Sequence, residues 1–275
     1  MTELELIPKF EVIKELDLRN LSTLNILNFN SKKIKKIQIR YGYKKINLED
    51  LFNVVVREVK SSNTFRKVTL FNTNHFFDNV GYQWSNDLLH VKGNIGSFLG
   101  TKMINGKIKV DGSTEDYLGC EMVGGEIYVN GNALNFVGSS SFGRKVGMTG
   151  GLISVNGSTG HNLGSYMRRG MILVGKKTGN YCANNLIAGT IIVRNTVGNN
   201  FCLGMKRGTI ILLNNYKKNY KNMHNCGEQE INFVSIIRNF VKRKGFVGFT
   251  NCNIFERFIG DQNNAGLGEV LIPIK

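Results

Sequence analysis

Few residues in this chain have the types and spacing that catalysis or metal binding would need. The histidines are far apart, and none has a second ligand at the spacing of a zinc motif; they are His75, His90, His161 and His224. Neither a GxSxG nucleophile motif nor a phosphate-binding P-loop motif occurs. Acidic residues are sparse through the middle of the chain. We therefore expect no catalytic site and no metal site on this chain alone, with a hydrolase that uses a groove of the molecule as the alternative.

Cysteine usage and hydropathy favour a cytoplasmic location. The five cysteines are widely spaced and include no CxxC pair; they are Cys120, Cys182, Cys202, Cys226 and Cys252. This pattern is typical of a reducing compartment and argues against a zinc ribbon or an iron–sulfur cluster. There is no apolar run of about 18 residues, and the N-terminal stretch MTELELIPKFEVIKEL lacks the apolar region of a signal peptide. We expect a cytoplasmic protein that does not enter the membrane.

The formal net charge of +16 is compatible with a nucleic acid, an acidic partner protein or an anionic ligand. The cations stand in small groups, at 32–36, 217–221 and 242–244. No RNP signature, zinc finger or helix-turn-helix pattern accompanies them. We therefore favour an acidic partner or an anionic ligand over nucleic acid.

A ten-residue pattern recurs along the middle of the chain. MINGKIKVDG at 103–112, MVGGEIYVNG at 122–131 and MTGGLISVNG at 148–157 are three copies. The first position repeats at intervals of 19, 26, 19, 19 and 19 residues and holds Met103, Met122, Met148, Met167, Leu186 and Met205. One such unit cannot bury an apolar face alone, whereas stacked units can. The repeat predicts a mainly β protein, a parallel β-helix built as a glycine-rich solenoid with coils of about 19 residues.

Each coil contains one short strand whose second and fourth residues are aliphatic. These pairs are Ile108 and Val110, Ile127 and Val129, Ile153 and Val155, Ile172 and Val174, Ile191 and Val193, and Ile210 and Leu212. Because side chains alternate along a strand, both members of each pair should point into the rod. The methionine position should form a third interior ladder, and a glycine column should mark corners of the coils. In that column Ala183 and Cys202 replace glycine.

The third residue of each strand should point outward, and its character changes along the rod. In chain order this position holds His90, Lys109, Tyr128, Ser154, Leu173, Ile192 and Ile211. A strand face in contact with water should stay polar. The last three positions must therefore be covered, either by the C-terminal helix of the chain or by a partner protein. Leu173, Ile192 and Ile211 are our interface candidates.

A seven-residue insertion interrupts the repeat between Met122 and Met148. Insertions in solenoids form loops, often on a binding face. The segment GSSSFGRKVG is rich in hydroxyl groups and carries Arg144 and Lys145. These two residues are the candidates for binding an anion, and a plain surface loop is the alternative.

The two ends of the chain differ from the repeat. We expect a small α+β cap at 1–65, the glycine-rich repeat domain at 66–215, and a C-terminal helix and closing segment at 216–275 that pack on the rod.

The C-terminal helix is expected within EQEINFVSIIRNFVKRKGF, residues 228–246. Its first apolar row, at helical spacing, is Ile231, Val234, Ile237 and Val241, and its second is Phe233, Ile236 and Phe240. A helix with so wide an apolar arc should be well buried. Gly245 should end it.

The repeats resemble the GxGxG domain family. That family includes the C-terminal domain of the large subunit of glutamate synthase. It also includes the C subunits of formylmethanofuran dehydrogenase and of the bacterial formyltransferase/hydrolase complex. The segment KIKKIQIRYGYKKINLEDLFNV at 33–54 resembles the region before the repeats in these C subunits. ERFIGDQNNAGLGEVLI at 256–272 resembles their closing motif, carried here by Arg257, Gly260, Asp261, Gly266, Gly268 and Glu269.

The resemblance implies a non-catalytic scaffold, the C subunit of a bacterial formyltransferase/hydrolase complex in one-carbon metabolism. Such a complex takes a formyl group from formyl-tetrahydromethanopterin to a methanofuran analogue and releases formate. The implied partners in this hetero-oligomer are an amidohydrolase-type A subunit, which holds the metal, together with a B subunit and a formyltransferase D subunit. No cofactor is expected on this chain itself. The acidic tail of the methanofuran analogue could be steered by Arg144 and Lys145.

Two relatives remain as alternatives. One is the C subunit of the archaeal formylmethanofuran dehydrogenase, whose complex contains a molybdenum or tungsten pterin and iron–sulfur clusters. The other is a domain protein of the glutamate synthase type.

Overall fold

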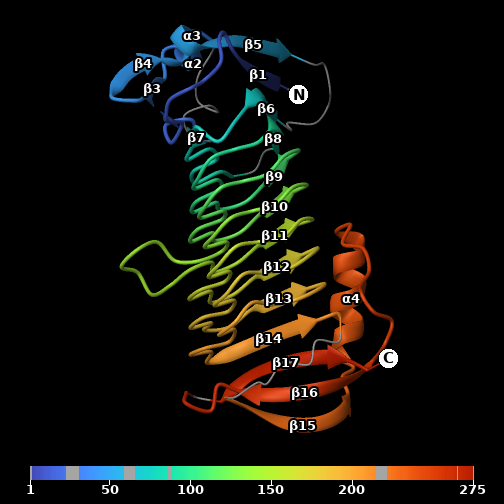
Figure 1. Cartoon of the computed structure of the whole chain (residues 1–275). Coiled ribbons are helices and arrows are strands. Elements are labelled where there is room, and N and C mark those ends of the chain that lie inside the picture. Colours follow the sequence, from blue (N-terminus) through green and yellow to red (C-terminus); the bar gives the residue numbers. More distant parts are fainter. Residues whose placement is uncertain are drawn as a thin grey trace.

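The computed structural model describes residues 2–22, 31–58, 66–85, 88–214, 222–264 and 266–274. Stacked strands form a rod, with a small second sheet at the N-terminal end and one helix along a side (Figure 1). Within the described residues, the main sheet has 13 strands in the order β15-β16-β17-β14-β13-β12-β11-β10-β9-β8-β6-β1-β5. No helix in the described part of the chain is long and apolar enough to cross a membrane.

The centre of the sheet consists of one short strand from each coil. These strands are β8 (Leu88–Gly93), β9 (Lys107–Val110), β10 (Glu126–Val129), β11 (Leu152–Val155), β12 (Met171–Val174), β13 (Thr190–Val193) and β14 (Arg207–Leu212). Neighbouring strands pair in parallel and in register, so that Ile108 lies beside Ile127 and Ile172 beside Ile191. The predicted parallel β-helix is confirmed.

The interior of the rod contains the predicted ladders. All aliphatic residues at the second and fourth strand positions from β9 to β14 are at most 1% exposed, and so are the methionine-position residues. Gly119 shows why corners need glycine: its φ is +61°, and a Cβ there would lie 2.4 Å from Cδ1 of Ile153. Ala183 and Cys202 keep the same left-handed conformation, with φ of 59° and 61°.

The N-terminal segment is part of the main sheet. The sequence did not predict this, because the segment lacks the repeat. β1 (Thr2–Pro8) pairs in parallel with β6 (Arg66–Thr73) and antiparallel with β5 (Phe52–Glu58), so Leu4 and Leu6 extend the interior ladder beside Val68 and Leu70. A second sheet has the order β4-β3-β2-β7. Its strands are β2 (Leu16–Asp17), β3 (Gln38–Tyr41), β4 (Lys44–Asn47) and β7 (Phe77–Asp78), accompanied by the short helices α2 (Ser31–Lys35) and α3 (Leu48–Leu51).

The C-terminal segment closes the other end of the rod. β17 (Leu267–Pro273) pairs in parallel with β14, so Val270 continues the interior ladder beside Ile210. β16 (Ile254–Gly260) and β15 (Met223–Glu230) then pair antiparallel. The expected domain boundaries at 65/66 and 215/216 lie within or beside segments outside the described residues, at 59–65 and 215–221, and they stay predictions.

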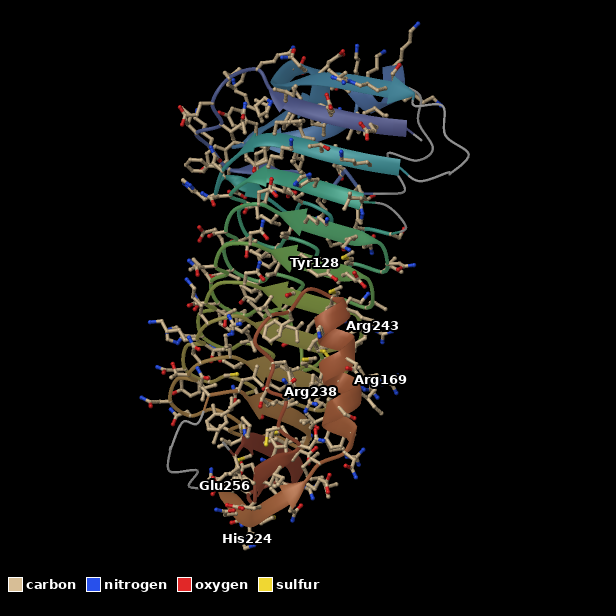
Figure 2. The ribbon with its side chains drawn as sticks, turned by 90° about the vertical axis from the view of Figure 1, so that its right-hand side faces the viewer. Tyr128, Arg169, His224, Arg238, Arg243 and Glu256 are labelled. Carbon is tan, nitrogen blue, oxygen red and sulfur yellow. The ribbon has the colours of Figure 1, made fainter. Side chains whose placement is uncertain are left out.

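Helix α4 (Phe233–Arg243) lies along the outer face of the last coils (Figures 1 and 2). Its 11 residues rise about 16 Å, which matches three to four strand spacings of about 4.8 Å. It begins later than the apolar pattern, because 223–230 form β15. Gly245 follows its end with φ +83°, as predicted.

The burial of α4 is narrower than its wide apolar arc predicted. Val234 and Val241 are fully buried, whereas Phe233 is 41% exposed and Ile236 is 71% exposed. The expectation of a well-buried second apolar row is therefore wrong for these two residues. The rod has only one face to offer the helix, so the row beside that face stays in contact with water.

Candidate functional site

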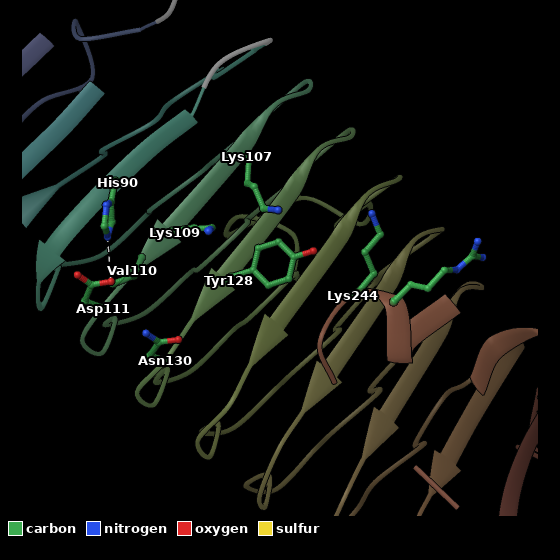
Figure 3. A pocket seen from close by; sticks show the side chains of 9 residues that line it. His90, Lys107, Lys109, Val110, Asp111, Tyr128, Asn130 and Lys244 are labelled. Atoms are coloured by element: carbon green, nitrogen blue, oxygen red, sulfur yellow. Dashed lines mark hydrogen bonds and ion pairs between the residues drawn. The ribbon is translucent and has the colours of Figure 1, made fainter. Parts of the chain in front are cut away.

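A pocket of about 480 Å³ lies where the C-terminal end of α4 approaches the outer face of β8–β10 (Figure 3). Its walls include the polar half of the outward-facing column together with residues that follow the strands and end the helix. The lining residues are His90, Lys107, Lys109, Val110, Asp111, Tyr128, Asn130, Arg243 and Lys244. Parallel pairing in register brings His90, Lys109 and Tyr128 side by side although they lie about 19 residues apart in sequence.

Glu126, the first residue of β10, holds the end of the helix against the sheet. Its carboxylate accepts a hydrogen bond from Lys244 at the end of α4 and pairs with Lys107 at 3.6 Å. The hydroxyl of Tyr128 donates to the same carboxylate at 2.8 Å. Lys107 also lies over the ring of Tyr128, 4.7 Å from its centroid. The four side chains form one connected cluster along an edge of the pocket.

The titration behaviour of this cluster follows from its contacts. Burial alone would raise the pKa of Glu126, but the hydrogen bonds from Lys244 and Tyr128 and the charges of Lys244 and Lys107 outweigh it and hold the pKa below its usual value. Burial, with the hydrogen bond to Glu126 and its negative charge, raises the pKa of Tyr128 well above its usual value. At neutral pH the pair is therefore a carboxylate and a neutral phenol.

The pocket has more positive than negative charge. Four cationic side chains line it, while the carboxylates present are Glu126 beside it and Asp111, which lies 2.9 Å from His90. None of the ion pairs within the described residues involves Lys109 or Arg243. Chemically, the arrangement is suited to binding an anion.

The structure places Arg144 and Lys145 far from this pocket. Their insertion protrudes as the yellow-green loop on the side of the rod away from α4 (Figure 1). Nε of Arg144 lies 3.4 Å from a carboxylate oxygen of Glu121, which also pairs with Lys102 at 3.8 Å. Ser141 donates to Glu121 as well, so this carboxylate orders the base of the loop. Lys145 is exposed, and Arg144 is exposed as well but pairs with Glu121.

The interface candidates Leu173, Ile192 and Ile211 are fully buried inside the chain. They form one apolar cluster with Val234 and Val241 of α4. The sequence left open whether the C-terminal helix or a partner protein covers these residues, and in the structure the helix covers them. The strip is therefore an internal contact and not an exposed surface.

The histidines do not form a site with one another. His161 accepts a hydrogen bond from the backbone N–H of Asn180 at 2.9 Å, which places its Nδ1 in a turn between coils. In the part of the chain that the structure describes, no group of three or more His, Cys, Asp or Glu side chains is arranged to hold a metal ion.

The closing motif is a set of structural contacts. Glu269 pairs with Arg257 at 3.0 Å and accepts a hydrogen bond from Thr209 at 2.7 Å. Asp261, only 1% exposed, accepts a hydrogen bond at 2.9 Å from the backbone N–H of Gly204 in the last coil. These residues attach the C-terminal strands to the end of the rod.

Sequence reasoning found the residues of the pocket only in part. The outward column identified His90, Lys109 and Tyr128 as a polar strip, but not Lys244 as their neighbour. A signal was available: Glu126 is one of the few acidic residues of the repeat, and its position at the start of a strand beside that strip invites a cationic partner.

Comparison with solved structures shows a chain of similar fold over nearly the whole length. The chain is similar to one in the X-ray crystal structure of the formyltransferase/hydrolase complex (FhcABCD) from Methylorubrum extorquens in complex with methylofuran. The TM-score is 0.86 at 28% sequence identity, over 98% of this chain and 100% of that chain. The resemblance expected from the repeats and end motifs is thus confirmed. No curated protein matches the sequence significantly.

The family is identified by the repeats themselves. The sequence profile of the GXGXG motif matches residues 52–243, well over half of the chain. The matched range begins with β5 and extends to the end of α4, so it includes the whole stack of coils and the helix that covers it. The protein belongs to the GXGXG motif family.

Proposed function

We propose that this chain is a scaffold, the C subunit, of a formyltransferase/hydrolase complex. The observation that carries the proposal is the similarity over nearly the whole of both chains to a component of such a complex. A rod with a buried aliphatic interior supports a scaffold role, because its function would be to present surfaces at fixed positions. The chemistry would then take place on partner subunits, one of the amidohydrolase type and one a formyltransferase.

In this proposal the complex transfers a formyl group from formyl-tetrahydromethanopterin to a methanofuran analogue and hydrolyses it to formate. The structure in complex with methylofuran supports the choice of a furan cofactor. The test is to purify the tagged chain from its source, identify the accompanying polypeptides by mass spectrometry and measure bound metals. Amidohydrolase and formyltransferase partners with formate release would support the proposal. Molybdenum or tungsten with iron–sulfur clusters would move the chain to the dehydrogenase, and a chain that purifies alone would refute the scaffold role.

The contribution of this chain to steering an acidic cofactor can be assigned by comparing two pairs of cations. Replacing Arg144 and Lys145 by alanine removes the charges of the insertion, and replacing Lys109 and Arg243 by alanine removes two charges of the pocket. If the insertion steers the cofactor, only the first double variant will weaken the salt dependence of its apparent affinity. If the pocket steers the cofactor instead, only the second double variant will do so; both variants remove two positive charges, so the change in net charge is the same.

A further inference from the structure

The outer side of α4 presents apolar side chains to water in a row that the rod does not cover. Phe233, Ile236 and Phe240 follow one another at helical spacing, and we call them the outer row. Phe233 and Ile236 are 41% and 71% exposed, while Phe240 packs partly against the buried cluster. The buried side of α4 already packs on Leu173, Ile192 and Ile211, so the exposed side chains of the row are not needed to hold the helix on the rod.

The C-terminal end of the outer row is strongly basic. Arg243 follows Phe240 by three residues and so continues the row toward the end of the helix, with Lys242 exposed beside it. The helix contains no acidic residue. Within the described residues, the carboxylate that the fold brings to its end is Glu126, which is engaged with Lys244 and Lys107. An apolar row with a basic end is complementary to an apolar groove with carboxylates at its rim.

Charge also decides between a second copy of this chain and a different protein. Two copies of α4 placed face to face would bring like charges together, on chains that each carry a net charge of +16. A different chain with an acidic rim meets no such repulsion. We propose that the outer row of α4 is the surface through which this chain docks an apolar, acid-rimmed groove of another subunit. The inference rests on the proposed function, since it requires a hetero-oligomer.

The test uses the complex purified through a tag on this chain from its source. Ile236→Glu places a negative charge in the centre of the outer row on a side chain whose exposure makes the fold insensitive to it. Ile13→Glu is the matched control, because Ile13 is 61% exposed and lies on the N-terminal cap. We expect Ile236→Glu to lower the recovery of at least one partner subunit by tenfold or more, and Ile13→Glu to leave recovery unchanged. Equal recovery in both variants, or equal loss in both, would overturn the docking surface.

A second measurement keeps the inference testable should Ile236→Glu disturb the helix. A photo-crosslinking amino acid at position 236 of the otherwise unchanged chain should label a partner subunit within the purified complex, and the same amino acid at position 13 should not label that subunit. Absence of a crosslink from position 236 would count against the proposal. A wild-type chain that purifies with no partner would instead refute the proposed function, so the two failures are distinguishable.

Discussion

Arg257 and Glu269 form an ion pair, with Nε and Oε2 separated by 3.0 Å, that joins the two C-terminal strands β16 and β17. The other oxygen of the carboxylate accepts a hydrogen bond from Thr209 on β14. One side chain of β17 therefore connects β16 to the last coil of the rod. Two residues of the closing motif thus attach the C-terminal strands to the end of the rod.

Replacing Glu269 by alanine should destabilise the protein by about 1–3 kcal/mol, because it leaves Nε of the partly buried Arg257 and the hydroxyl of Thr209 without their acceptor. The matched control is Glu5→Ala, which breaks the ion pair between Glu5 on β1 and Arg57 on β5. Arg57 is 63% exposed, so its pair should contribute about 0–1 kcal/mol. Urea unfolding of both variants measures the difference. Equal losses would show that the closing contact is no stronger than a surface ion pair.

A comparison of alanine substitutions at Gly119 and Gly143 separates the cost of backbone strain from the cost of steric crowding. Both have positive φ, at +61° and +78°, but only Gly119 has a neighbour within 3 Å of the position that a Cβ would take, namely Ile153. Gly143→Ala should therefore cost about 1 kcal/mol for the left-handed conformation alone. Gly119→Ala should cost about 2–4 kcal/mol, because it adds overpacking in the core. Thermal melting of the two variants tests this, and a smaller loss for Gly119→Ala would contradict the packing of the coils.

The raised pKa of Asp78 predicts that the stability of the fold depends on pH. Burial, opposed by the hydrogen bond from the backbone of Ser97 and reinforced by nearby acids, raises its pKa from 3.8 to about 6. Since the folded state holds the proton more tightly than the unfolded chain, this group stabilises the fold less as the pH rises from about 4 to about 6.

Asp78→Asn removes the charge and keeps an oxygen for the Ser97 N–H, which Oδ1 of Asp78 accepts at 2.6 Å. Relative to the wild type, this variant should gain about 1–2 kcal/mol of stability between pH 4 and pH 7, a figure reduced for partial solvent screening. Denaturant unfolding at the two pH values gives the difference directly. A stability difference that does not change with pH would show that the carboxyl titrates normally.

The cysteines should divide into two reactivity classes. Cys120, Cys182 and Cys202 are buried, and burial raises the pKa of Cys120 and of Cys182 to about 12. The thiolate is the reactive form, so these thiols should resist alkylation in the native protein. Cys226 and Cys252 are partly exposed and should be labelled first. Peptide mass spectrometry before and after denaturation reads out each site, and rapid native labelling of Cys182 would argue against the closed interior.

The rod could be predicted from the sequence because its signals are local and repeated. Alternation within each strand places Ile127 inside and Tyr128 outside, and the recurrence fixes the register between coils. The ends depend on pairing between distant segments, as when β1 joins β6 about 60 residues away, and no local pattern reports such a choice. The pocket was missed for the same reason, since Lys244 meets Glu126 across 118 residues.

The burial of α4 shows a different limit. Apolar spacing reveals that Ile236 belongs to an apolar row, but not whether the surface that covers this row is in the same molecule. The spacing of apolar residues identifies the faces of a helix, whereas the burial of each face depends on the surface that packs against it.

The main sheet ends on antiparallel strands at both edges, β5 and β15, although parallel pairing dominates between them. A stack of equivalent rungs has no intrinsic length, since any exposed parallel edge can template another rung, from its own chain or from a neighbour. Reversal of strand direction ends the series of parallel coils at both edges, and at β15 an irregularity in the pairing between Asn225 and Glu228 disfavours a further strand. The number of coils therefore sets the length of the rod. Each added or deleted coil would change the distance between its two ends by about 4.8 Å.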